Sequence, residues 1–125
     1  MEVTGTTAVV GLVGTPIIQV KMPGVMNRYF ADKGLDFVLI PMDVSPDGIP
    51  ALMQAVRRWN NLRGIIVTVP FKQVIAGLSD KLTDRASRLT TANVVRRNAD
   101  GTLEGEILDG VGFVAAARAN GCAPE

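Results

Sequence analysis

The chain has 125 residues, of which 47% are hydrophobic and 20% charged, and its formal net charge is +1. These values are typical of a single globular domain with its own core, and the scattered basic residues give no reason to expect nucleic acid or an anionic membrane as a partner. The absence of histidine excludes Ser-His-Asp and Cys-His catalysis and argues against a zinc site. The lone Cys122 cannot form an internal disulfide, so we expect a cytoplasmic protein.

Strands and helices are predicted to alternate in the first part of the chain. The apolar run 8–13 predicts a buried strand. Pro23 suits the first turn of a helix that ends before Gly34. The run 37–40 predicts a second strand, which Pro41 confines to a sheet edge or ends. The apolar face of the helix is expected to contain Val25, Met26, Tyr29 and Phe30.

The middle of the chain continues this alternation. Ser45-Pro46 opens a helix in which Trp59 is expected to be a core anchor. The β-branched run 65–69 predicts a third, buried strand, and Pro70 should end it because proline has no N–H for the ladder. Short helices are expected over 73–78 and 84–89.

The last part of the chain predicts a hairpin and a final helix. Asp100-Gly101 lies between the extended runs 93–97 and 102–106, a strong hairpin signal, and residues 110–120 suit a helix. Together these elements predict an α/β fold: a three-layer open mixed sheet, mostly parallel, with an antiparallel hairpin and helices on both faces. We expect one domain over residues 1–120 and a linker over 121–125.

Lys72 and Asp109 are the candidate catalytic residues. Lys72 follows the predicted strand 65–69, at the end of the sheet where open α/β folds bind ligands. A lysine that faces an aspartate from a distant segment can move a proton at a substrate hydroxyl. A solvated surface lysine after a strand explains the bare pattern equally well.

Five motifs occur in order: Gly14-Thr15-Pro16-Ile17, Pro23 with Asn27, Val67-Thr68-Val69-Pro70-Phe71-Lys72, Ala92-Asn93-Val94 and Asp109-Gly110-Val111-Gly112. Over residues 8–120 this series resembles the substrate-binding N-terminal domain of the shikimate dehydrogenase family. The resemblance implies a catalytic Lys72–Asp109 pair, and contacts from Thr68 and Asn93 to the ring hydroxyls of the substrate. Thr68 is also an ordinary strand residue, and Asn93 also suits a cap or a turn.

The resemblance further implies a nicotinamide cofactor, NADP or NAD, held by a Rossmann domain that would follow this one. Gly11 and Gly14 do not make a G-x-G-x-x-G fingerprint. We therefore expect no cofactor site in this chain and no dehydrogenase activity from it alone.

The chain departs from the family pattern at positions that are usually polar. The usual His-Ser-x-Ser-Pro, whose serines grip the substrate carboxylate, is replaced by Gln19-Val20-Lys21-Met22-Pro23. Ile66 and the pair Ile107-Leu108 also stand where the family has polar residues. We expect these side chains to line the pocket, with Val20, Met22 and Ile66 in contact with the substrate. Either Lys21 or Gln19 is a candidate to replace the lost serine contacts.

These departures predict a substrate less polar than shikimate, either a hydroxylated ring or a hydroxy acid. The first hypothesis is the catalytic half of a shikimate dehydrogenase-like oxidoreductase of aromatic amino acid biosynthesis. The alternative is a stand-alone small-molecule binding or interaction domain without turnover. A homodimer is also expected, because Phe71 and Phe113 would add apolar area to an exposed cleft surface.

Overall fold

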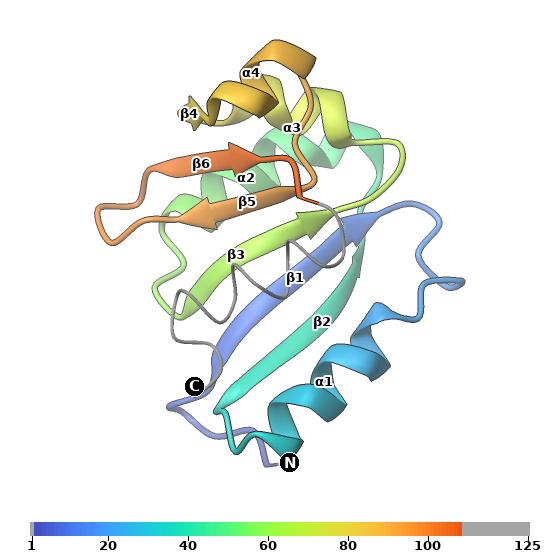
Figure 1. Ribbon diagram of the computed structural model, residues 1–125, viewed down its shortest axis with the longest axis vertical. Coiled ribbons are helices and arrows are strands. Elements are labelled where there is room, and N and C mark those ends of the chain that lie inside the picture. Colours follow the sequence, from blue (N-terminus) through green and yellow to red (C-terminus); the bar gives the residue numbers. More distant parts are fainter. Residues whose placement is uncertain (1, 109–125) are drawn as a thin grey trace.

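The structure, a computed structural model, describes residues 2–108 (Figure 1). These residues form one six-stranded sheet of order β2-β1-β3-β5-β6-β4. The elements are β1 (Ala8–Gly14), α1 (Met22–Asp32), β2 (Phe37–Asp43), the 3-10 turn η1 (Pro46–Gly48), α2 (Ile49–Arg57), β3 (Leu62–Val67), α3 (Lys72–Leu78), β4 (Lys81–Leu82), α4 (Asp84–Leu89), β5 (Val94–Arg97) and β6 (Leu103–Glu106).

The sheet is mixed, as predicted. The pairs β1–β2, β1–β3 and β4–β6 are parallel, while β3–β5 and β5–β6 are antiparallel. Pro41 lies inside β2, which is an edge strand and therefore has one side free of ladder partners. Helix α1 lies in front of the sheet in Figure 1, and α2 and α3 lie behind it.

Two apolar cores lie on the two faces of the sheet. On one face, α1 buries Met26 and Phe30 against Leu12, Leu39 and Ile66. On the other face, α2 and α3 pack against alternate residues of the same strands. That second core includes Ile49, Met53, Val56, Ile65, Val67, Phe71, Ile75 and Val95. Because successive strand residues point to opposite faces, Ile66 and its neighbours Ile65 and Val67 serve different cores.

Two expectations about the helices are wrong. Val25 is 64% exposed, because the face of α1 that meets the sheet centres on Met26 and Phe30. Trp59 is 37% exposed and lies beyond the end of α2, so it is not a core anchor. The buried positions of α2 are Ile49, Met53 and Val56, whose spacing keeps them on one stripe.

The β5–β6 hairpin forms as the Asp100-Gly101 signal predicts. Gly101 has φ +87°, a conformation that favours glycine, and the Asp100 carboxylate accepts hydrogen bonds from the N–H and hydroxyl of Thr102. Gly64 permits β3 and β5 to pair, since a Cβ there would lie 2.5 Å from the Val95 carbonyl oxygen.

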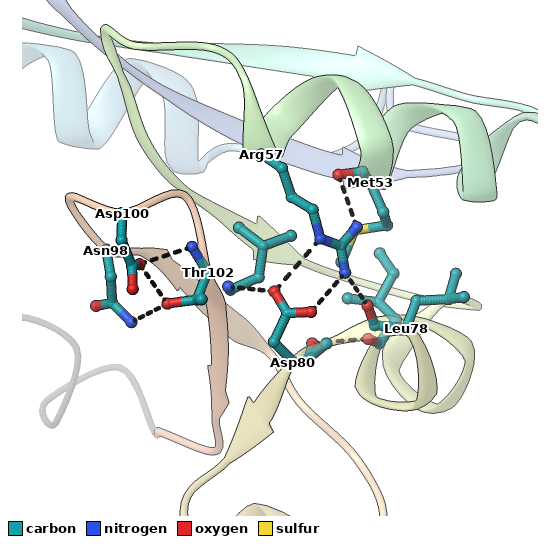
Figure 2. A network of polar contacts seen from close by, with 10 residues as sticks. Met53, Arg57, Leu78, Asp80, Asn98, Asp100 and Thr102 are labelled. Carbon is teal, nitrogen blue, oxygen red and sulfur yellow. Dashed lines mark hydrogen bonds and ion pairs between the residues drawn. The ribbon is translucent and has the colours of Figure 1, made fainter.

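A polar network ties α2 to the hairpin side of the sheet (Figure 2). The Arg57 guanidinium forms an ion pair with Asp80 at 3.1 Å and donates to the Leu78 carbonyl at 2.8 Å. The Leu103 N–H donates to the other carboxylate oxygen of Asp80 at 2.8 Å. The Arg57 hydrogen bond, with help from that N–H, holds the pKa of Asp80 below its usual 3.8.

Phe71 is buried at 2% exposure in the core behind the sheet, so it adds nothing to an exposed apolar surface. That part of the reasoning for a homodimer is wrong, although the nearby Val69 is 57% exposed. The predicted helix 110–120, Phe113 and Asp109 lie outside the described residues. Within residues 2–108, none of the helices has the length and apolar character that a membrane crossing requires.

Candidate functional site

A cavity of about 390 Å³ lies at the carboxyl ends of β1 and β3, on the face of the sheet that α1 covers. Its volume is at the lower end of the range for small-molecule sites. Its polar lining residues are Lys21, Thr68, Lys72 and Asn93. Its apolar lining residues are Leu12, Val20, Met22, Ile66, Val67, Val94 and Leu108.

The cavity collects residues from five separate stretches of the chain. Leu12 comes from β1, residues 20–22 from the β1–α1 connection and the first residue of α1, and residues 66–68 with Lys72 from the end of β3 and the start of α3. Residues 93–94 come from the start of β5, and Leu108 follows β6. The described residues that the sequence assigned to catalysis or substrate contact line it: Val20, Met22, Ile66, Thr68, Lys72 and Asn93. Of the two candidates for the lost serine contacts, Lys21 lines the cavity and Gln19 does not. Ile107, also expected in the pocket, is not among the lining residues. The expected approach of Asp109 to Lys72 falls outside the described residues and stays a prediction.

Backbone hydrogen bonds hold the polar lining residues in place. The Thr68 N–H donates to the Val13 carbonyl at 2.9 Å, which ties the end of β3 to β1. The Ala92 N–H donates to the Lys72 carbonyl at 3.0 Å. This bond joins the first residue of α3 to the segment that carries Asn93, so Lys72 and Asn93 are anchored to each other through the backbone.

Asn93 is bonded through its backbone and its side chain. Its carbonyl accepts from the Val67 N–H at 2.8 Å, and its N–H donates to the Glu106 carbonyl at 3.0 Å. Its side-chain Oδ1 accepts from the Leu108 N–H at 2.8 Å, and its Nδ2 donates to the Leu108 carbonyl. An amide has two donor hydrogens and two acceptor positions, so among the described residues one of each has no partner and could meet a ligand.

The described lining residues give the cavity a positive character. They include Lys21 and Lys72 but no aspartate or glutamate. The ion pairs within residues 2–108 are Arg57–Asp80 and Arg96–Glu106, and neither involves a lysine. The first turn of α1, which begins at Met22 in the cavity wall, carries no acidic residue. The cavity therefore suits a small anionic ligand with an apolar face.

The sequence reasoning missed Leu12, Val67 and Val94 as lining residues. Leu12 and Val67 lie near the carboxyl ends of β1 and β3, and Val94 is the first residue of their antiparallel neighbour β5. All three therefore lie at the end of the strands where the site is. The position of Lys72 just after a predicted strand was the sequence signal that could have indicated these lining residues, because side chains at the ends of neighbouring strands lie close together.

The described residues do not fit a dinucleotide or a metal. Gly14 ends β1, but a Cβ there would lie 2.3 Å from Thr68 Cγ2, so this glycine is required for packing against Thr68. A phosphate loop would need glycine backbone turned toward a ligand instead. Within residues 2–108, no group of three or more carboxylate or cysteine side chains is placed to hold a metal ion.

Comparison with known proteins identifies relatives of this chain. The family model for the shikimate dehydrogenase substrate binding domain matches residues 12–95. A shikimate dehydrogenase (NADP(+)) of Rubrobacter xylanophilus is 38% identical over 124 residues, which is 98% of this chain and 43% of that protein.

Solved structures show the same likeness. Shikimate 5-dehydrogenase from Listeria monocytogenes, solved with shikimate and NAD, matches with a TM-score of 0.82 and 36% identity over 97% of this chain and 41% of that one. The enzyme from Thermus thermophilus, solved with shikimate, matches with a TM-score of 0.77 and 25% identity over 92% of this chain and 43% of that one. The chain thus spans about two fifths of the length of these relatives. It belongs to the shikimate dehydrogenase family and contains the family's substrate binding domain.

Proposed function

We propose that this chain is the substrate-binding and catalytic half of an NADP-dependent shikimate dehydrogenase, and that the cavity binds shikimate. The observation that carries the proposal is the convergence of Lys72, Thr68 and Asn93, from separate segments, on one cavity whose described lining residues carry a net positive charge. A small ring that carries one carboxylate and several hydroxyls matches that lining in size and chemistry.

The residues that line the cavity divide into an apolar set and a polar set. Ile66 and Leu12 belong to the core under α1 and form apolar surface for a ring face. Thr68 and the unused amide positions of Asn93 are suited to ring hydroxyls. Each hydroxyl bound in this way would contribute about 0.5–1.5 kcal/mol to binding.

Lys72 is suited to the proton of the reacting hydroxyl. Oxidation of a secondary alcohol removes a hydride from carbon and a proton from oxygen, so the site needs a group that receives the proton. In this proposal the neutral amine of Lys72 receives the proton during oxidation, and the Lys72 ammonium returns it during the reverse reduction, with Asp109 as its partner as the family resemblance implies. The hydride acceptor would be held by residues outside those described, since the described ones do not fit a dinucleotide.

The names of the relatives favour shikimate over a less polar substrate. The loss of two serines suggests a ligand other than shikimate, yet the relatives compared above are named shikimate dehydrogenases, and the two structures compared above contain shikimate. We therefore take shikimate as the ligand, and the apolar Val20 and Met22 then require another partner for its carboxylate.

Calorimetric titration of the 125-residue chain with sodium shikimate tests the proposal. We expect saturable one-to-one binding that Lys72→Met weakens and Lys81→Met does not, because Lys81 lies in β4 and does not line the cavity. Shikimate that fails to bind at millimolar concentration, or that binds equally to both variants, would remove the proposed site.

A further inference from the structure

We propose that Lys21 binds the carboxylate of the substrate, in place of the serine hydroxyls that other family members carry on either side of this position. The inference rests on the proposed function for the identity of the ligand, but the carboxylate-binding role that it assigns to Lys21 can be tested with a simpler carboxylate.

The structure separates the two candidates for this role. Gln19 does not line the cavity, and its side-chain Nε2 donates to the Pro16 carbonyl at 3.0 Å, so the amide is used to hold its own loop. Lys21 lines the cavity and is the residue that precedes α1. Its long side chain carries a charge that reaches beyond its own backbone position.

Val20 and Met22 have taken a different role from the serines they replace. Both pack against the core formed by Leu12, Met26 and Phe30 under α1, while they also line the cavity. They therefore contribute apolar contact on either side of Lys21 and offer no hydrogen bond to an anion. Lys21 is the only charged group on this wall among the described lining residues.

Lys21 and Lys72 come from different segments of the chain. Lys72 begins α3 and is anchored through its carbonyl to Ala92, whereas Lys21 belongs to the β1–α1 connection. Two lysines on separate segments allow a division of roles: Lys21 holds the carboxylate and Lys72 stays with the reacting hydroxyl. The side chain of Lys21 makes no capping hydrogen bond to α1, and the first turn of that helix holds no acid that would compete with a ligand anion.

A lysine recognises a carboxylate differently from two serines. The serines offer neutral, directional hydrogen bonds, whereas an ammonium group is a mobile point charge whose attraction falls with added salt. Substrate binding should therefore depend on ionic strength and on the ligand's charge, and should depend little on the geometry of the anionic group.

The test is a titration followed by the methyl NMR signals of Val20 and Met22. The probes are sodium shikimate, sodium cyclohexanecarboxylate and the neutral cyclohexanecarboxamide. We compare wild type with Lys21→Met, Lys21→Arg and Lys33→Met, the last being an exposed lysine directly after the other end of α1. Dispersed amide spectra check that each variant is folded.

We expect Lys21→Met to weaken both carboxylates at least about fivefold, since a charge-assisted contact in a partly open site lies between a surface ion pair and a buried one. Lys21→Arg and Lys33→Met should stay within about twofold of wild type, and the amide should bind wild type and Lys21→Met alike. Raising salt from about 20 to 300 mM should weaken binding of the carboxylates to wild type, Lys21→Arg and Lys33→Met more than binding to Lys21→Met.

The outcomes separate this inference from the proposed function. If shikimate binds and Lys21→Met has no larger effect than Lys33→Met, Lys21 is not the carboxylate partner, and the proposed function stands. If cyclohexanecarboxylate binds through Lys21 while shikimate does not bind, the charge assignment stands and the proposed function fails. If neither carboxylate binds, both are wrong.

Discussion

The side-chain amide of Asn93 holds the backbone of Leu108 at two points, accepting from its N–H at 2.8 Å and donating to its carbonyl. Leu108 is the residue before Asp109, the proposed partner of Lys72. The same asparagine is bonded through its own backbone to Val67 and Glu106. Asn93 thus joins the ends of β3 and β6 through its backbone and holds Leu108 through its side chain.

Asn93→Ala should therefore weaken both the fold and shikimate binding. Loss of two hydrogen bonds in a partly buried place should lower the free energy of unfolding by about 1–3 kcal/mol. Affinity for shikimate should fall at least about fivefold, because ligand contacts are lost with the clamp. Denaturant unfolding and calorimetry measure the two effects.

Asn27→Ala is the matched control for that variant. The Asn27 amide holds the Leu39 backbone in the same way, at 2.9 and 2.7 Å, on the far edge strand and away from the cavity lining. Asn27→Ala should lower the free energy of unfolding by a similar amount and leave the affinity for shikimate unchanged. Equal losses of affinity in both variants would show that Asn93 acts only through stability.

Lys72→Met should abolish turnover when this domain is joined to a nicotinamide-binding domain. We expect kcat to fall by about a hundredfold or more, because the proton of the substrate hydroxyl loses its acceptor, while KM changes far less. Steady-state kinetics with Lys81→Met as the control measures this. A Lys72→Met enzyme whose kcat stays within about twofold of wild type would exclude Lys72 from proton transfer.

The double variant Val20→Ser with Met22→Ser should bind shikimate more tightly and be less stable than wild type. The two hydroxyls should improve shikimate binding by about tenfold, as two hydrogen bonds to a charged group would. Both residues pack against the core under α1, so the double variant should also unfold at lower denaturant concentration. If affinity does not rise, the serine positions do not face the carboxylate in this chain.

The 125-residue chain alone should not bind NADP or NAD. The glycines near the end of β1 serve strand packing, and none of the described loops offers a phosphate cradle. Calorimetry at millimolar cofactor should show no saturable heat. Saturable binding in the micromolar range would contradict this reading of the β1–α1 connection.

Asp80→Asn should reduce stability at neutral pH and flatten its acid dependence. The Arg57 hydrogen bond lowers the folded-state pKa of Asp80 below 3.8, so the stabilisation is complete above that value and is lost as pH falls through the folded-state pKa. Wild type should therefore lose more stability than Asp80→Asn between pH 7 and about pH 3. Parallel losses in the two proteins would show that this ion pair contributes nothing.

Local signals in the sequence predicted much of the fold. The pair Asp100-Gly101 predicts the β5–β6 hairpin because few residues other than glycine adopt the positive φ seen there. The short helix expected over 84–89 forms as α4, and the Thr83 hydroxyl before it accepts from the Ala86 N–H. Pro41 predicts an edge strand, since it lacks a donor for a second neighbour.

Other features depend on partners that are distant in sequence. The two-residue strand β4 exists because it pairs with β6, and nothing in Lys81–Leu82 alone predicts it. Trp59 has the spacing of a core residue, but α2 ends at Arg57 and leaves it half exposed. Periodicity describes one element at a time, whereas burial depends on where that element ends and on what covers it.

The candidate site divides in the same way. The sequence by itself determined which residue types are present: a lysine after a strand, a threonine and an asparagine in the family order, and apolar residues where serines are usual. The tertiary structure decided that residues from separate segments line one cavity, that Lys21 lines it while the Gln19 amide bonds to its own loop, and that Asn93 holds Leu108. These features depend on hydrogen bonds and contacts between residues distant in sequence, so they exist only once the strands are paired and their ends lie side by side.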